Sequence, residues 1–123
     1  MKTIRKSGED YLEAIYNLLE NDDHAHSADI ARALGVSKPS AFKALQILNE
    51  QGYIEKESYG AVTLTEKGRL YAKNIKNKHK AVYMLLTDVL GVSPKEAEID
   101  ACKIEHFIGE ETTKKLFKFL KIN

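Results

Sequence analysis

Two groups of side chains in this 123-residue sequence have the types and spacing of metal ligands. The groups are Asp10 with Glu13, and Cys102 with Glu105 and His106, while His79 lies between them. Residues three or four apart lie on one face of a helix, so each group can present its ligand atoms together. If the helices that carry these groups converge, carboxylates, imidazoles and a thiolate meet in a small volume. The pattern therefore predicts a site for a divalent transition metal.

The donor types leave the choice of metal open. Carboxylate oxygens suit Mn(II), whereas imidazole and thiolate shift the preference toward Fe(II), Co(II) or Zn(II). Co(II) or Zn(II) are expected to occupy such a donor set in vitro.

Each candidate ligand also has an interpretation without metal. The two carboxylates near the start can favour the positive end of a helix, and Cys102 can be a small buried apolar residue. A glutamate followed by a histidine can form a hydrogen-bonded pair, and His79 stands in a basic stretch that is typical of a surface. The pair His24 and His26 is an incomplete ligand set, and we interpret both as loop residues.

The middle of the chain is basic, although the formal net charge is only +1. Residues 24–80 contain ten basic and five acidic side chains, which suits contact with DNA phosphates. Hydroxyl and lysine side chains at the start of a helix can bind phosphates and base edges. The candidate DNA-binding residues are Ser37, Lys38, Pro39, Ser40, Lys43, Lys56 and Tyr59. Alternatively, these lysines form a solvated face on a fold that contacts proteins.

Several elements must position these residues. Apolar spacing predicts a helix over about 8–20 with Ser7 as its N-cap, a short helix over 27–34 that Gly35 ends, and a further helix from Ser37 to Gly52. The short turn between the last two is that of a helix-turn-helix unit. Alternating residues 53–56 and 61–64 predict a β-hairpin, which would be the wing.

The remaining sequence is predicted to be helical. A long helix opens at Thr65 or Glu66 and ends before Gly91, and a capping box at Ser93 with a following proline starts another, which we expect to continue to Gly109. A last amphipathic segment carries Leu116, Phe117 and Leu120. The predicted fold is mainly α with a small β-hairpin: a winged helix-turn-helix over 1–73, followed by a helical region over 74–123 that carries His79, Cys102, Glu105 and His106.

Composition narrows the class of protein. No apolar run approaches the roughly 18 residues of a membrane span, and the N-terminus has no apolar signal stretch, so we expect a cytoplasmic protein without membrane partners. The single cysteine excludes an intramolecular disulfide. The length is short for an enzyme with separate cofactor and substrate domains, and we expect neither catalysis nor a small-molecule substrate.

The sequence resembles the diphtheria toxin repressor family of metal-dependent regulators, in particular its short manganese-responsive branch, which lacks the SH3-like domain of the longer branch. The resemblance spans nearly the whole chain. It is carried by Glu9 to Tyr16, Ala28 to Ala31, Val36-Ser37 with Pro39-Ser40, Leu64 to Gly68, His79, and Cys102 to His106.

This resemblance implies a homodimeric repressor of metal-uptake genes that binds double-stranded operator DNA when Mn(II) or Fe(II) is bound. It implies that residues 74–123 are the metal-binding and dimerisation region. It assigns Asp10, Cys102, Glu105 and His106 to one metal site, and Glu13 and His79, with Glu105 shared, to a second. The manganese branch has a carboxylate at the position of Cys102, and the iron branch has methionine at that of Asp10. Cys102 can therefore coordinate through its thiolate, favouring a softer ion, or through its backbone carbonyl, favouring Mn(II).

Two other classes of function remain open at this stage. One is a metal-independent winged-helix regulator in which oxidation of Cys102 controls DNA binding. The other is a hydrolase with a paired-metal centre, although no additional acid–base group accompanies the candidate ligands.

Overall fold

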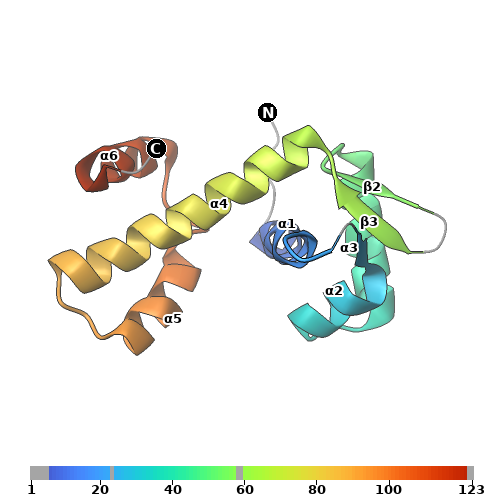
Figure 1. Ribbon diagram of the computed structural model, residues 1–123, viewed down its shortest axis with the longest axis horizontal. Helices are drawn as coiled ribbons and strands as arrows, with labels where there is room; N and C mark the ends of the chain where they lie inside the picture. Colours follow the sequence, from blue (N-terminus) through green and yellow to red (C-terminus); the bar gives the residue numbers. More distant parts are fainter. Residues whose placement is uncertain (1–5, 23, 58–59, 122–123) are drawn as a thin grey trace. The chain divides into compact units, whose positions relative to one another are not determined.

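The computed structural model describes residues 6–22, 24–57 and 60–121. The chain forms two compact units, Met1–Lys73 and Asn74–Asn123 (Figure 1). Helix α4 (Glu66–Met84) contains the boundary between the units. No helix in the described part of the chain combines the length and apolar character needed to span a lipid bilayer.

The N-terminal unit is a helix-turn-helix with a small antiparallel sheet, as predicted. Its elements before α4 are α1 (Lys6–Leu19), β1 (Ala25–His26), α2 (Ser27–Leu34), α3 (Lys38–Glu50), β2 (Ile54–Lys56) and β3 (Ala61–Leu64). The strand order is β1-β3-β2, so β3 is central. Figure 1 shows α3 beside the β2–β3 hairpin.

The turn between α2 and α3 forms as the sequence predicts. Gly35 adopts a left-handed conformation (φ 67°), in which a residue without a Cβ is favoured, and its N–H caps the end of α2. Ser37 is the N-cap of α3, and its Oγ accepts a hydrogen bond from the Ser40 N–H at 3.2 Å. These two residues fix where α2 ends and α3 begins.

Strand β1 was not predicted from the sequence. His26, which we interpreted as a loop residue, lies in this strand and pairs with Ala61, so the hairpin becomes a three-stranded sheet. Two residues are too few to show the alternation by which a strand is predicted. His24, which we also interpreted as a loop residue, lies outside the helices and strands.

The core of this unit joins the three helices to the sheet and to the start of α4. Its buried residues include Leu12, Ile15, Ile30, Leu45, Leu48, Ile54, Val62 and Ala72. Glu9 is also buried, and its Oε2 accepts a hydrogen bond from the Tyr71 hydroxyl at 2.8 Å. This bond fixes α1 against the first part of α4.

The predicted start of α1 was wrong. The helix begins at Lys6, so Ser7 lies inside it and does not precede it as the N-cap. The apolar spacing defines which face of a helix is buried, but it defines the ends less well.

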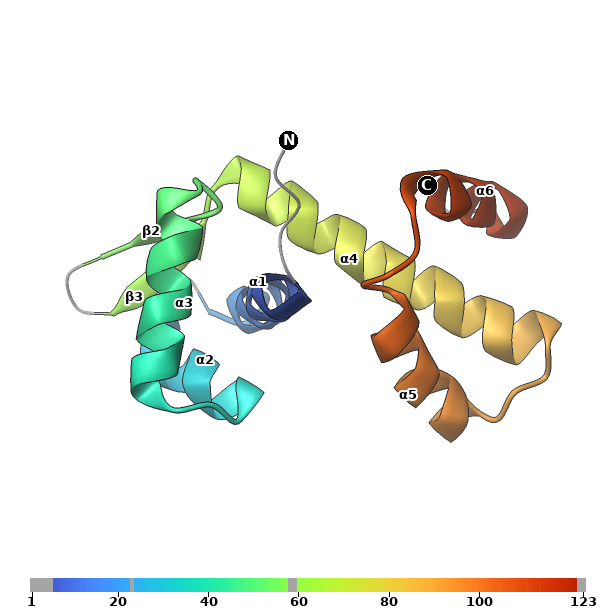
Figure 2. The same ribbon diagram turned by 180° about the vertical axis from the view of Figure 1, so that it is seen from behind.

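In the C-terminal unit, α4 is followed by a π-helical turn, α5 and α6. The π-helical turn is Leu85–Val89, α5 is Pro94–Ile104 and α6 is Glu110–Leu120. The predicted cap is confirmed, because the Ser93 Oγ accepts a hydrogen bond from the Glu96 N–H at 3.4 Å. Figure 2 shows α5 running back beside the C-terminal part of α4.

The predicted end of the helix at Gly109 was wrong. Helix α5 ends at Ile104, Phe107 N–H bonds to the Ile104 carbonyl at 2.9 Å, and Gly109 is the N-cap of α6. Glycine can occupy a position on either side of a helix end, so its presence alone did not distinguish the two.

Candidate functional site

His79 on α4 faces α5 and lies at the centre of a group of possible ligands. Its Nε2 is 3.0 Å from Oε1 of Glu98, and its Nδ1 is 3.9 Å from Sγ of Cys102. The Cys102 Sγ is in turn 4.0 Å from the Glu98 Oε1. One ligand atom from each of the three residues lies within 4.8 Å of the other two. Nitrogen, oxygen and sulfur donors therefore meet on one side of the C-terminal unit.

Glu105 and His106 extend this group at the end of α5. Oε2 of Glu105 lies 3.0 Å from Nδ1 of His79, and Oε1 lies 3.5 Å from Nε2 of His106. The side chains of Glu105 and His106 are each only 2% exposed. Glu105 thus links the two histidines, and His79 has a carboxylate at each ring nitrogen.

Glu98 was missed in the sequence analysis. It precedes Cys102 by four residues on α5, so the two share a helix face with Glu105 in the next turn. That spacing was a usable signal. Glu98 also stands between two other acidic residues, Glu96 and Asp100, that have no common face with the cysteine.

The donor set fits a divalent transition metal. In a tetrahedral site with typical metal–nitrogen and metal–sulfur distances, neighbouring ligand atoms are about 3.5 Å apart. With one ligand atom taken from each of His79, Glu98 and Cys102, no two of these atoms are more than 4.8 Å apart, so modest side-chain movement would bring them to that spacing. A histidine that binds metal through one nitrogen commonly donates from the other to a carboxylate. His79 has such a partner on either side, in Glu98 and Glu105.

The two remaining predicted ligands, Asp10 and Glu13, belong to the N-terminal unit. Both are half-buried on α1 and line a hollow together with Asn17, Asp22 and Leu34. Next to them, burial raises the pKa of Tyr11 above its ordinary value, so this core hydroxyl stays protonated. The carboxylates share one helix face, as the sequence predicted.

The candidate DNA-binding residues lie on α3 and β2. On α3, the buried residues Ala41, Leu45 and Leu48 define the inner face. The predicted DNA-binding residues of this helix, which are Ser37, Lys38, Pro39, Ser40 and Lys43, are all exposed. Lys56 is half-buried on β2, and Tyr59 lies outside the described residues.

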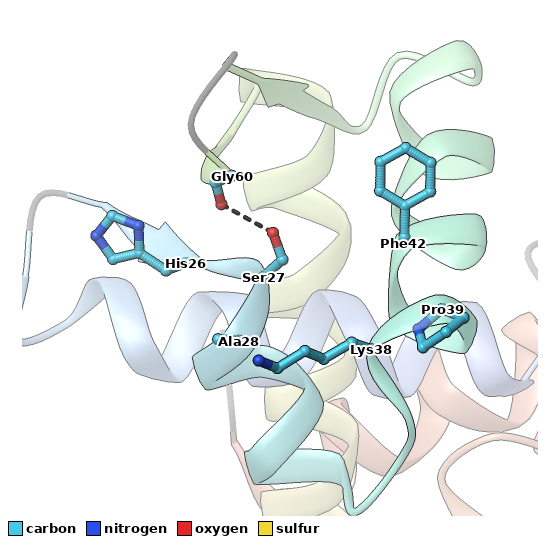
Figure 3. Close-up of a pocket in the computed structure, with 7 residues that line it drawn as sticks. All are labelled: His26, Ser27, Ala28, Lys38, Pro39, Phe42 and Gly60. Atoms are coloured by element: carbon cyan, nitrogen blue, oxygen red, sulfur yellow. Dashed lines mark hydrogen bonds between the residues drawn. The ribbon is translucent and has the colours of Figure 1, made fainter.

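A hollow opens between the starts of α2 and α3 and the end of the hairpin (Figure 3). Lys38, Pro39 and Phe42 line its α3 side. On the opposite side, the Ser27 Oγ donates a hydrogen bond to the Gly60 carbonyl at 3.1 Å, and the Ser27 N–H bonds to the same oxygen at 2.9 Å. These bonds connect the hairpin to the first turn of α2, a contact that sequence patterns did not indicate.

Both units match parts of one protein family. Residues 4–62 match the N-terminal DNA binding domain of the iron dependent repressors, and residues 65–122 match their metal binding and dimerisation domain. Together the two matches cover most of the chain.

Individual proteins similar to this chain are also transcriptional regulators. The chain is 36% identical over 119 residues to an uncharacterized HTH-type transcriptional regulator of Methanocaldococcus jannaschii, with 96% of this chain and 95% of that protein covered. It is 39% identical over 104 residues to the transcriptional regulator MntR of Escherichia coli O6:H1, covering 85% of this chain and 66% of the relative.

The fold is that of a solved manganese-dependent transcriptional repressor in complex with manganese, with a TM-score of 0.83 and 28% identity. That match covers 94% of this chain and 53% of the solved one, so the chain spans about half of its length. On these matches, the chain belongs to the iron-dependent repressor family of metal-dependent, DNA-binding transcriptional regulators.

Proposed function

We propose that the chain is a repressor that binds double-stranded operator DNA as a homodimer when Mn(II) or Fe(II) is bound, and so controls metal uptake. The family's members are transcriptional repressors and not enzymes, which agrees with our expectation of a non-enzymatic protein and sets the hydrolase hypothesis aside. The observation that carries the proposal is the cluster of His79, Glu98 and Cys102 in a unit that matches a metal-binding domain.

In this proposal, Cys102, Glu105 and His106 bind the metal together with Asp10 from α1, and His79 and Glu13 form a second position with Glu105 shared. Glu98 either adds a ligand or orients the His79 ring through Nε2, which lies 3.0 Å from its carboxylate. When bound, the metal supplies positive charge that offsets the gathered carboxylates.

The effect on DNA binding follows from this ligand set. Without a cation, Asp10 and Glu13 repel the carboxylates of α5, and the N-terminal units of a dimer are free to separate. With the ligands held together, two α3 helices can stand about 34 Å apart, which is the spacing of half-sites one DNA turn apart. Because the coupling is reciprocal, operator DNA must raise metal affinity by the same factor.

The experiment that tests this function compares DNA binding with and without metal. Sites selected from random duplex DNA in the presence of Mn(II) are expected to bind about 5- to 150-fold more weakly when a chelator is added, the range that typical couplings of 1–3 kcal/mol imply. Fluorescence anisotropy measures both affinities. Affinity that ignores the chelator but falls with peroxide would instead support the metal-independent regulator controlled by Cys102.

A second measurement determines how Cys102 binds. Anaerobic titration of metal-free protein with Co(II) is expected to give a near-ultraviolet thiolate charge-transfer band, since Sγ lies 3.9 Å from the His79 ring. Cys102→Ser should lose the band while keeping weaker d–d absorption, and the chain has no other cysteine to replace it. Binding without the band would mean coordination through the backbone carbonyl and favour Mn(II). Absence of any binding would contradict the metal-dependent function.

A further inference from the structure

Helix α3 presents one large aromatic side chain on its outer face. Phe42 is 53% exposed, whereas Ala41 and Leu45 beside it are fully buried. The other outward residues of the same face are Pro39, Lys43 and Gln46, which follow helical spacing. The Phe42 ring therefore contributes little to the core, and its exposure requires another explanation.

A lysine from the hairpin fixes this ring in place. The Nζ of Lys56 on β2 lies 3.4 Å from the centroid of the Phe42 ring, which is a cation–π contact. The ring consequently has a lysine on one face and borders the hollow in Figure 3, whose α3 side also carries Lys38. An apolar group with a lysine against it is complementary to the major groove of DNA, which has acidic phosphates along its edges and one apolar group, the thymine methyl.

We propose that Phe42 is a specificity-determining residue that contacts the C5-methyl group of a thymine in the major groove, and that Lys56 is the positioning residue that holds its ring. The inference rests on the proposed function and deepens it, because it names a base preference. Phe42 has no donor or acceptor, so it cannot bind a phosphate or the polar edge of a base. Thymine is the base that offers it an apolar contact in this groove.

Position on the helix supports this assignment. Phe42 is in the second turn of α3, and the first turns of a recognition helix are those that contact base edges. Residues 4–62, which include both Phe42 and Lys56, match the family's DNA binding domain. Lys56 retains donors that can also bind a neighbouring phosphate.

The test uses deoxyuridine, which differs from thymidine by loss of that methyl group. Sites are first selected from random duplex DNA with the full-length protein and Mn(II), and each thymine of one half-site is then replaced in turn. At one position, the replacement is expected to weaken wild-type binding about fourfold, the factor that corresponds to burial of one methyl group. For Phe42→Ala the same replacement should have no effect.

Ile47→Ala is the matched control. Ile47 is also an exposed apolar residue of α3, 47% exposed, but it follows Phe42 by five residues, a spacing that does not bring the two side chains together on a helix. This variant should keep the fourfold methyl effect. Equal methyl effects in wild-type protein and in Phe42→Ala at every position would overturn the inference while leaving the proposed function intact. Failure of wild-type protein to select any DNA would instead refute the proposed function itself.

The role of Lys56 is tested by the same ratio. Lys56→Met should lower the methyl effect to about twofold, because the ring is no longer held, and Lys56→Arg should restore it because the cation is kept. Loss of a phosphate contact alone would weaken binding to both DNAs equally and leave the ratio unchanged. An unchanged ratio in Lys56→Met would therefore contradict the positioning role, and unfolding midpoints check that each variant is folded.

Discussion

Replacing Glu105 with glutamine is expected to weaken Mn(II) or Fe(II) binding by about 100-fold, and metal-dependent DNA binding with it. Glu105 is 2% exposed, and its two oxygens lie 3.0 Å from Nδ1 of His79 and 3.5 Å from Nε2 of His106. The substitution keeps the shape of the side chain but removes its charge and makes one end a donor, which cannot bind a cation. Loss of groups that only support ligands costs 10- to 100-fold, so a shared ligand belongs at the upper end.

The matched control is Glu110→Gln. Glu110 lies on α6, its side chain is 85% exposed, and it forms a surface ion pair with Lys114 at 3.4 Å. Such pairs contribute little, so the control should bind metal and DNA as the wild type does. Isothermal titration with Mn(II) measures affinity, and urea unfolding confirms that both variants fold. An unchanged metal response in Glu105→Gln would refute the assignment of Glu105 as a ligand.

The sequence predicted those elements whose signals are local. Helices α2 and α3 follow from an apolar period, a glycine after one and a capping serine before the other, all within a few residues. Strand β1 could not be predicted, because Ala25 and His26 form a strand only by pairing with β3, which lies more than 30 residues later. Gly109 was predicted to end a helix, but it precedes α6. The turn at 105–108, which separates α5 from α6, has no sequence pattern by which it could be predicted.

In the candidate site, contacts within one helix could be predicted from the sequence, whereas contacts between helices could not. Cys102, Glu105 and His106 share a face through helical spacing, so their proximity could be inferred from the sequence. The approach of His79 to Glu98 joins two helices, and no spacing along the chain encodes it. The contact of Glu98 with His79, as short as that of Glu105, is therefore visible only in the structure, although the spacing of Glu98 from Cys102 could be read from the sequence.

A second large effect is expected from Gly68→Ala, in the first turn of α4. A Cβ at this position would overlap the carbonyl oxygen of Tyr53 and lie 2.8 Å from its carbonyl carbon, and backbone atoms cannot rotate away. The approach is close because the Thr65 N–H bonds to the same Tyr53 carbonyl at 3.1 Å, while the Gly68 N–H bonds to the Thr65 Oγ1 at 3.0 Å. The start of α4 is thus fixed directly against the end of the helix-turn-helix.

Relief of the overlap would move the start of α4 away and disturb two contacts beyond it. The rings of Tyr53 and Tyr71 pack edge to face at 5.5 Å, and the Tyr71 hydroxyl bonds to the buried carboxylate of Glu9. Overpacking a well-packed region costs about 1–3 kcal/mol, and a weakened bond to a buried carboxylate adds to it. We expect Gly68→Ala to lower the free energy of unfolding by about 3 kcal/mol.

Urea unfolding followed by circular dichroism measures this loss, and Gly109→Ala is the matched control. A Cβ at Gly109 meets no atom within 4 Å, and the backbone there has a negative φ of −76°. That variant should differ from the wild type by less than about 1 kcal/mol, since it changes only the helix cap and the freedom of the unfolded chain. If Gly68→Ala were as stable as the control, α4 would not depend on close contact with Tyr53.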